Sequence, residues 1–278
     1  MISFASICEW LDLTTLQYHW QVVAISALLC SILFEVSQSL SPLLFPKAFQ
    51  HFKGYTPTNW HIHVVSTLHA VIITIGSLVI LSDGNLSQNR VFGYSPFAAN
   101  IYSISCGYFV WDVITAILYI KNQGVSMVCH GVAAFLVLFL SYRPFINYYG
   151  AVFLLYEAST PFLNFNWFMD KLGWTGSKAQ LVNGIFLISI FFLARIVFGF
   201  YMSYWLWIDI CAVKDLVPLR YWIVYGAANA MTSFLNVYWF GLMIRSLRKR
   251  FDSDATTTTP ANNNNRNLAS AAAAANKV

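Results

Sequence analysis

The chain alternates between long apolar runs and short polar segments, and the length of the apolar runs predicts its fold. A helix needs about 20 apolar residues to cross the hydrocarbon of a bilayer. Seven runs come close to that length, at residues 22–45, 64–82, 97–120, 126–142, 146–168, 180–207 and 221–244. Each predicts a helix, because an open strand edge cannot exist in lipid. The pattern therefore predicts an all-α polytopic membrane protein, a bundle of about seven transmembrane helices.

The overall composition excludes a soluble globular protein. Hydrophobic residues make up 58% of the chain and charged residues 10%, and the mean hydropathy is +0.59. A soluble domain would carry about 25% charged residues. The net charge of +5 lies largely beside the apolar runs, so no nucleic-acid partner is expected. The five cysteines show no CxxC or Cys/His ligand spacing, so we expect no metal site, and no cofactor is indicated.

The distribution of lysine and arginine predicts how the bundle is oriented. If the seven runs cross the membrane, alternate loops hold nine of these residues on one side and four on the other. The richer side is expected in the cytosol, which places the amino end in the lumen and the carboxyl end in the cytosol. The sequon at Asn85, Leu86 and Ser87 then falls on the lumenal side, where it is a candidate glycosylation site.

Three segments follow from this topology. Residues 1–45 form a lumenal amino end and the first span, and residues 46–250 form the main transmembrane bundle. From residue 251 the sequence becomes low in complexity, with the runs "TTTTPANNNN" and "AAAAA". This composition predicts a disordered cytosolic tail over residues 251–278.

Polar residues inside the apolar runs are the candidates for a functional site. At about 1.5 Å per residue, His69, Asp112 and His130 lie roughly 6 to 12 Å from the cytosolic side. An isolated polar side chain in hydrocarbon is costly, so we expect the three to line one polar pocket open toward the cytosolic leaflet, with apolar walls leading inward. Alternatively, His69 is an ordinary hydrogen-bonded residue between helices, and Cys129, beside His130, only packs.

A second polar layer is expected deeper in the membrane. Glu157 and Arg195 lie on consecutive runs at similar depth and are expected to pair, as structural support or as part of a site. Pro161 follows one turn after Glu157, where its ring breaks the helix and frees the carbonyl of residue 157. Asn164 and Asn183 add polar surface to the same region. Glu35 of the first run lies near this depth as well.

These residues occur in segments that resemble the TLC-domain family. The carrying segments are "VVSTLHA" (64–70), "GYFVWD" (107–112), "CHG" (129–131), "LLYEASTPFLNFNWF" (154–168) and "VNGI" (182–185), together with Arg195. The family groups the translocating-chain-associating membrane protein, the longevity-assurance ceramide synthases and the ceroid-lipofuscinosis protein. The branch that the chain resembles is the small TLC domain-containing protein 4 type.

The resemblance implies specific roles for several positions. Ceramide synthases open their signature motif with two adjacent histidines, which fall here on Cys129 and His130, so only the second histidine is present. Their acidic region falls near Glu157, without the His-Asp…Asp arrangement. The homeobox-like insert of many ceramide synthases is missing.

Three functions remain open on the sequence alone. The first is a non-enzymatic protein that binds a membrane lipid or fatty acyl chain and influences membrane lipid homeostasis. The second is a ceramide-synthase-like N-acyltransferase with acyl-CoA as co-substrate; there His130 is the general base, His69 and Asp112 orient it, and Cys129 is a candidate acyl acceptor. The third is a cargo adaptor of the early secretory pathway. An endoplasmic reticulum location comes from the resemblance, and the oligomeric state is open.

Overall fold

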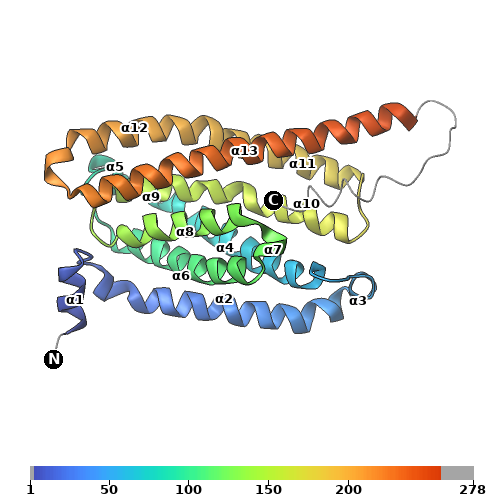
Figure 1. Cartoon of the computed structure of the whole chain (residues 1–278), viewed down its shortest axis with the longest axis horizontal. Coiled ribbons are helices and arrows are strands. Elements are labelled where there is room, and N and C mark those ends of the chain that lie inside the picture. Colours follow the sequence, from blue (N-terminus) through green and yellow to red (C-terminus); the bar gives the residue numbers. More distant parts are fainter. Residues whose placement is uncertain (1–2, 258–278) are drawn as a thin grey trace.

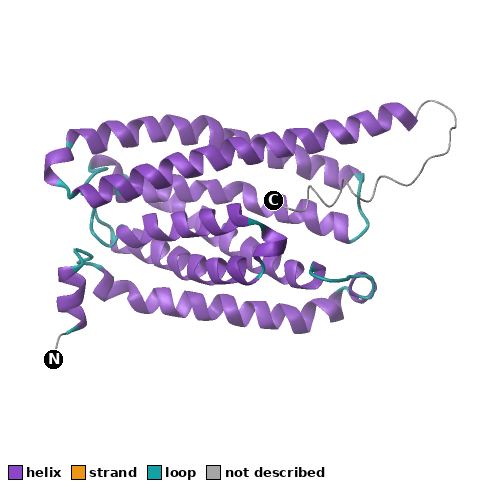
Figure 2. Cartoon of the chain, viewed as in Figure 1, coloured by secondary structure: helices purple, strands orange, loops and turns teal. Residues whose placement is uncertain are grey.

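A computed structural model describes the backbone of residues 3–257 and the side chains of residues 3–247. The part of the chain that it describes contains helices and loops and no strand. The long helices run side by side along the long axis of the molecule (Figures 1 and 2). This is the all-α arrangement that the apolar runs predict.

The first half of the chain supplies three of the long helices. Its elements are α1 (Phe4–Trp10), α2 (Leu16–Leu44), α3 (Pro46–Phe49), α4 (Thr56–Ser82), α5 (Asn85–Gln88) and α6 (Pro96–Leu118). Helix α6 begins with proline at its first position, where the missing N–H leaves no donor unpaired. Ser95 caps it, because its hydroxyl accepts a hydrogen bond from the Ala98 N–H at 3.4 Å.

The second half is more interrupted. Its elements are α7 (Ile120–Gln123), α8 (Val125–Leu140), α9 (Asn147–Leu154), η1 (Leu155–Ser159), α10 (Thr160–Lys171), α11 (Lys178–Phe191), η2 (Phe192–Phe198), α12 (Gly199–Ala212), η3 (Lys214–Leu216) and α13 (Leu219–Thr257). The segments α11, η2 and α12 form one continuous helical stretch, Lys178–Ala212.

Each of the seven expected runs falls on a helix or on consecutive helices. Within the described residues, four stretches are long and apolar enough to cross a membrane: Leu16–Leu44, Thr56–Ser82, Pro96–Leu118 and Lys178–Ala212. Helix α8 is apolar but shorter, with 16 residues. The protein is therefore a multi-pass membrane protein, and the total of seven crossings stays a prediction.

Several boundaries differ from those expected. Helices α2 and α4 begin at Leu16 and Thr56 rather than at 22 and 64, because polar residues such as His61 continue the helix beyond the apolar run. Helix α13 continues to Thr257, although the tail is expected to begin at residue 251. The basic run "RSLRKR" before that point consists mainly of good helix formers. The rest of the expected tail, residues 258–278, lies outside the described residues.

Two irregular segments interrupt the α-helices, one at Glu157 and the other at Arg195. The helix that starts at Asn147 changes to a 3-10 turn at Leu155, and α10 begins at Thr160 with Pro161 in its first turn. The expected break at Pro161 is thus present, and Glu157 lies within the turn. The expectation that the carbonyl of residue 157 is freed is wrong, because this carbonyl accepts a hydrogen bond from the Thr160 N–H within the 3-10 turn. Arg195 lies in the π-helical segment η2, a form that often occurs at functional sites.

The helices that carry the candidate residues Asp112 and His130 lie in the centre of the bundle. Helix α2 runs along one edge and α12 and α13 along the opposite edge, with α4, α6, α8, α9 and α10 between them (Figure 1). Helix α6 is the most enclosed of the candidate spans and α2 the least. Gly107 allows α2 to pack closely on α6, because a Cβ there would overlap the backbone of Val23.

Candidate functional site

Two cavities of different character meet inside the bundle. One is rich in polar groups and is lined by Asn59, His63, Asp112, Asn164 and Arg195, among others. The other is mainly apolar and is lined by residues of α8, α9, α12 and α13 that include Ala133, Val137, Leu138, Phe153, Leu206 and Tyr225. Phe109, His130 and Glu157 line both cavities. The two spaces therefore adjoin at these three side chains.

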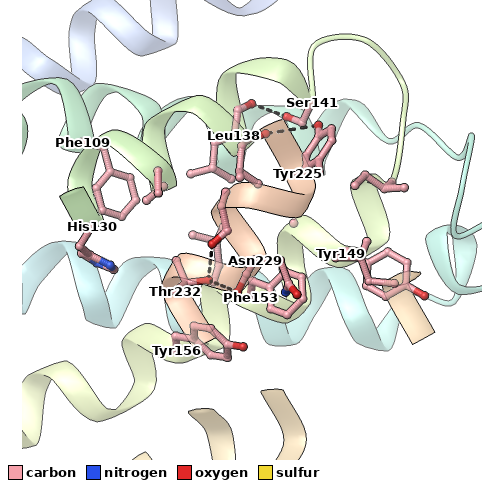
Figure 3. A pocket seen from close by; sticks show the side chains of 18 of the residues that line it. Phe109, His130, Leu138, Ser141, Tyr149, Phe153, Tyr156, Tyr225, Asn229 and Thr232 are labelled. Carbon is pink, nitrogen blue, oxygen red and sulfur yellow. Dashed lines mark hydrogen bonds between the residues drawn. The ribbon is translucent and has the colours of Figure 1, made fainter. Parts of the chain in front are cut away.

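His130 lies on α8 at this junction. Its ring is half-buried between Phe109, with ring centroids 6.0 Å apart, and Trp239, at 5.3 Å in an edge contact. Figure 3 shows Phe109 and His130 at one end of the apolar cavity and Tyr149 at the other. No described residue forms a hydrogen bond with either ring nitrogen of His130, and the residue lines both cavities.

Asp112 lies on the facing helix α6, is 6% exposed, and lines the polar cavity with His130. Gly131, the neighbour of His130, makes this approach possible. A Cβ at Gly131 would lie 3.2 Å from Asp112 Oδ2 and 2.8 Å from Val113 Cγ2. The glycine therefore allows α8 to come close to the carboxyl group of Asp112.

His69 does not share the cavity, and the expectation that it would do so is wrong. Its Nε2 lies 3.3 Å from the Ser105 hydroxyl, and its ring stacks on Tyr108 at a centroid distance of 3.7 Å. It is 5% exposed and lines neither space. It is thus a packed residue between α4 and α6, which was the alternative interpretation. Equal depth in the membrane does not determine which face of a helix a residue occupies.

His63 is the histidine that α4 contributes instead, and the sequence interpretation missed it. Its Nδ1 lies 2.7 Å from Asn164 Oδ1 and its Nε2 3.2 Å from Asn59 Nδ2. The Asn164 amide in turn donates to the Thr67 hydroxyl at 2.8 Å. Because Asn164 Oδ1 can only accept, the proton of this histidine is on Nδ1. His63 lies just before the expected run 64–82, but Pro57 signals an earlier helix start.

Glu157 and Arg195 approach each other as expected, at the outer limit of an ion pair. Arg195 Nη2 lies 4.0 Å from Glu157 Oε1. Arg195 donates shorter hydrogen bonds to the Tyr156 carbonyl, at 2.9 Å, and to the Ser159 hydroxyl, at 3.2 Å. It also reaches Asn236 Oδ1 at 3.4 Å. The guanidinium is held mainly by uncharged groups, and the Glu157 carboxylate keeps acceptor capacity toward both cavities.

The remaining sequence candidates lie away from the junction. Cys129 is half-buried and lines neither cavity. Pro161 is buried at the start of α10, where it shapes the turn that carries Glu157. The Asn183 amide donates to the Phe162 carbonyl at 2.8 Å and so ties α11 to α10. Asn85 is exposed on α5, with its amide 2.7 Å from Asp83 Oδ2.

Comparison with known proteins gives a consistent result. The TLC-domain profile matches residues 59–245 of the chain. An uncharacterised TLC domain-containing protein of Schizosaccharomyces pombe is 36% identical over 87% of this chain and 83% of its own length. Topoisomerase I damage affected protein 4 of Saccharomyces cerevisiae is 29% identical over 83% and 85%, respectively. Human TLC domain-containing protein 4 is 29% identical over 68% and 77%. No solved structure matches the chain.

Proposed function

Because this chain belongs to the TLC-domain family, we propose that it binds one lipid or fatty acyl chain inside its helix bundle and contributes to membrane lipid homeostasis. The observation that carries the proposal is the junction of a polar and an apolar cavity at Phe109, His130 and Glu157. A molecule with a polar head and a single apolar tail matches this division.

The apolar cavity would hold the tail. Its walls include Ala133, Val137, Leu138 and Leu206, which offer no hydrogen-bonding side chain. Transfer of each methylene from water into such a space is worth about 0.8 kcal/mol. Asn229 also lines this space, but its amide already donates to the Ser203 hydroxyl at 2.9 Å. The tail would therefore contact a surface whose side chains are mostly apolar or already hydrogen-bonded within the protein.

The polar cavity would hold the head group. Asp112 and Glu157 supply acceptors, and Arg195 supplies a cation within the same space. Asn122 and Gln123, which line it as well, belong to a segment that the loop charges predict on the cytosolic side. The head group would then enter from the cytosolic leaflet, with the amino end of the protein in the lumen. The endoplasmic reticulum is the membrane we propose.

A second candidate is acyl transfer from acyl-CoA, and the position of His130 favours it. The ring nitrogens of His130 have no partner among the described side chains, and the ring borders both cavities. It can act as a general base toward an amine or hydroxyl at the junction. His69 and Cys129 line neither cavity, so they are poorly placed to orient this base or to accept an acyl group. Asp112 is the acidic partner that remains.

The test measures the lipid that stays with the purified protein in nanodiscs. Native mass spectrometry should find one amphiphile per chain. Val137→Trp fills the apolar cavity and should reduce its occupancy at least tenfold. Leu136→Trp is the matched control, because Leu136 is 40% exposed on the same helix and lines neither cavity; its occupancy should not change. Equal occupancy in both variants would refute the proposed tail site.

The catalytic alternative needs its own assay. The purified protein is incubated with acyl-CoA of several chain lengths and with a mixture of amine and hydroxyl lipids. Transfer that is lost in His130→Ala and kept in His69→Ala would establish His130 as the base. If the unmutated protein transfers no acyl group, the site is a binding site only.

A further inference from the structure

Helix α2 carries a polar and small-residue stripe on its outer surface. Its members are the polar or small residues Gln21, Ala24, Ser31, Glu35 and Gln38 together with one large apolar residue, Leu28, and all are exposed. They follow one another at alternating intervals of three and four residues. This is the heptad spacing with which two helices pack along a seam, and in membranes such seams are rich in small and polar residues.

The neighbouring stripe of α2 has a different character. It consists of Ile25, Leu29, Ile32, Val36, Leu40 and Leu43, also exposed and fully apolar. Lipid tails are a favourable environment for these apolar side chains. The opposite side of the helix packs on the bundle through buried polar residues, since the Ser26 hydroxyl donates to the Ile104 carbonyl and Ser37 contacts His61. The exposed polar stripe is therefore the one surface of α2 for which lipid is a poor neighbour.

Glu35 is the residue of this stripe that is least compatible with surrounding lipid. It lies nine residues before Leu44, the last residue of α2, which is about 14 Å along the axis. Among the described residues, none forms a hydrogen bond or ion pair with its carboxylate, and the Gln38 amide is likewise without a partner. An ionisable side chain at membrane depth is costly unless another group meets it. The pair Glu35 and Gln38 thus has no partner among the side chains of residues 3–247 and calls for one from outside this part of the chain.

The surface beside the stripe is hollowed. A groove between α2 and α6 is lined by Ser31, Glu35, Ile114, Thr115 and Leu118, among others. Ile114 and Leu118 are 55% and 72% exposed on the α6 side of this groove. Helix α2 lies at the outer edge of the bundle (Figure 1) and is the least enclosed of the candidate spans, so a further transmembrane helix can approach it from outside the bundle.

We propose that this stripe is a dimer interface, in which α2 packs against α2 of a second copy about a two-fold axis along the membrane normal. The stripe is complementary to itself, because it carries an acceptor, Glu35, and a donor, Gln38, one turn apart. In a parallel pair Glu35 faces Glu35 of the other copy, and the Gln38 amide of each copy lies about 4.5 Å further along the axis, within side-chain reach of that carboxyl group. Two carboxyl groups near the axis can also retain a shared proton. Ala24 and Ser31 allow the backbones to approach closely.

The first test is a disulfide cross-link between differently tagged copies in native membranes. Ser31→Cys lies on the stripe and should cross-link the two copies after mild oxidation. Ile32→Cys is the matched control, because it is turned by about 100° onto the apolar stripe, and it should not cross-link. The unsubstituted protein reports any bond from native cysteines such as Cys30. Equal cross-linking at both positions, or none at Ser31, would overturn the proposal.

The second test asks whether the polar pair holds the dimer. Glu35→Ala combined with Gln38→Ala should lower the dimer fraction in nanodiscs at least tenfold, whereas Val36→Ala should leave it unchanged. The thermal transition of the monomer should stay the same, since all three side chains are exposed. An unchanged dimer fraction in the double variant, or cross-linking of Ser31→Cys to a different protein, would reject a second copy as the occupant.

Discussion

Arg195 and Glu157 carry opposite charges in the centre of the bundle, yet the shortest hydrogen bonds of Arg195 go to uncharged groups. The 3-10 turn exposes the Tyr156 carbonyl, which accepts from Nε at 2.9 Å, whereas the charge–charge distance is 4.0 Å. The turn thus fixes the arginine, and the carboxylate remains available to the cavities.

Arg195→Met should lower the free energy of unfolding by about 3 kcal/mol, which is the lower end of the range for removing one partner of a buried charge pair. Glu157→Gln should cost about 1 kcal/mol, because it keeps the shape and loses one distant interaction. Reversible unfolding in mixed micelles measures both. The double variant should cost less than the sum of the two. Strictly additive losses would mean that the two residues are not coupled.

The helices that carry the polar residues could be predicted from the sequence, but the faces on which these residues lie could not. Counting along the expected helices placed His69, Asp112 and His130 in one layer, and two of the three share a cavity. His63 and His69 are six residues apart, which is about 120° around a helix. Which of the two histidines faces the cavity depends on how α4 packs against both α6 and α10. The sequence of α4 alone does not contain this information.

At the scale of elements, the close contact between α6 and α8 brings Asp112 and His130 to the same cavity. Gly131→Ala should separate these helices and lower the free energy of unfolding by about 1–3 kcal/mol, as overpacking does. Gly184→Ala is the control, because a Cβ there meets nothing within 4 Å. It should be neutral or stabilising by up to about 1 kcal/mol through helix propensity. A mild effect at Gly131, equal to that at Gly184, would show that the contact is not tight.

The apolar runs predict where the helices lie, but the sequence predicts only some of the irregular segments within them. Pro161 signals the break before α10, because its ring is incompatible with a regular helix at that point. The π-helical segment around Arg195 has no comparable signal. It contains neither proline nor glycine, and it depends on the groups of η1 and α13 that surround the arginine.

At the scale of the whole molecule, the bias of basic residues predicts a lumenal amino end and a cytosolic carboxyl end. In sealed microsomes, a tag after Val278 should be cut by added protease, and a tag before Met1 should be protected. Asn85 should carry a glycan, since it is exposed in the expected lumenal loop. Asn85→Gln should abolish the mobility shift that endoglycosidase removes. Protection of the carboxyl-terminal tag would mean that the topology is inverted.

Under the proposed function, one amphiphile occupies the two adjoining cavities, with its head beside Asp112, Glu157 and Arg195. The most direct measurement is a cryo-electron microscopy map of the protein in lipid nanodiscs. Elongated density should extend from His130 and Glu157 between Val137 and Leu206, with a compact end in the polar cavity. A map of sufficient quality that shows both cavities closed by side chains, with lipid density only on the outer surface of the bundle, would contradict the account.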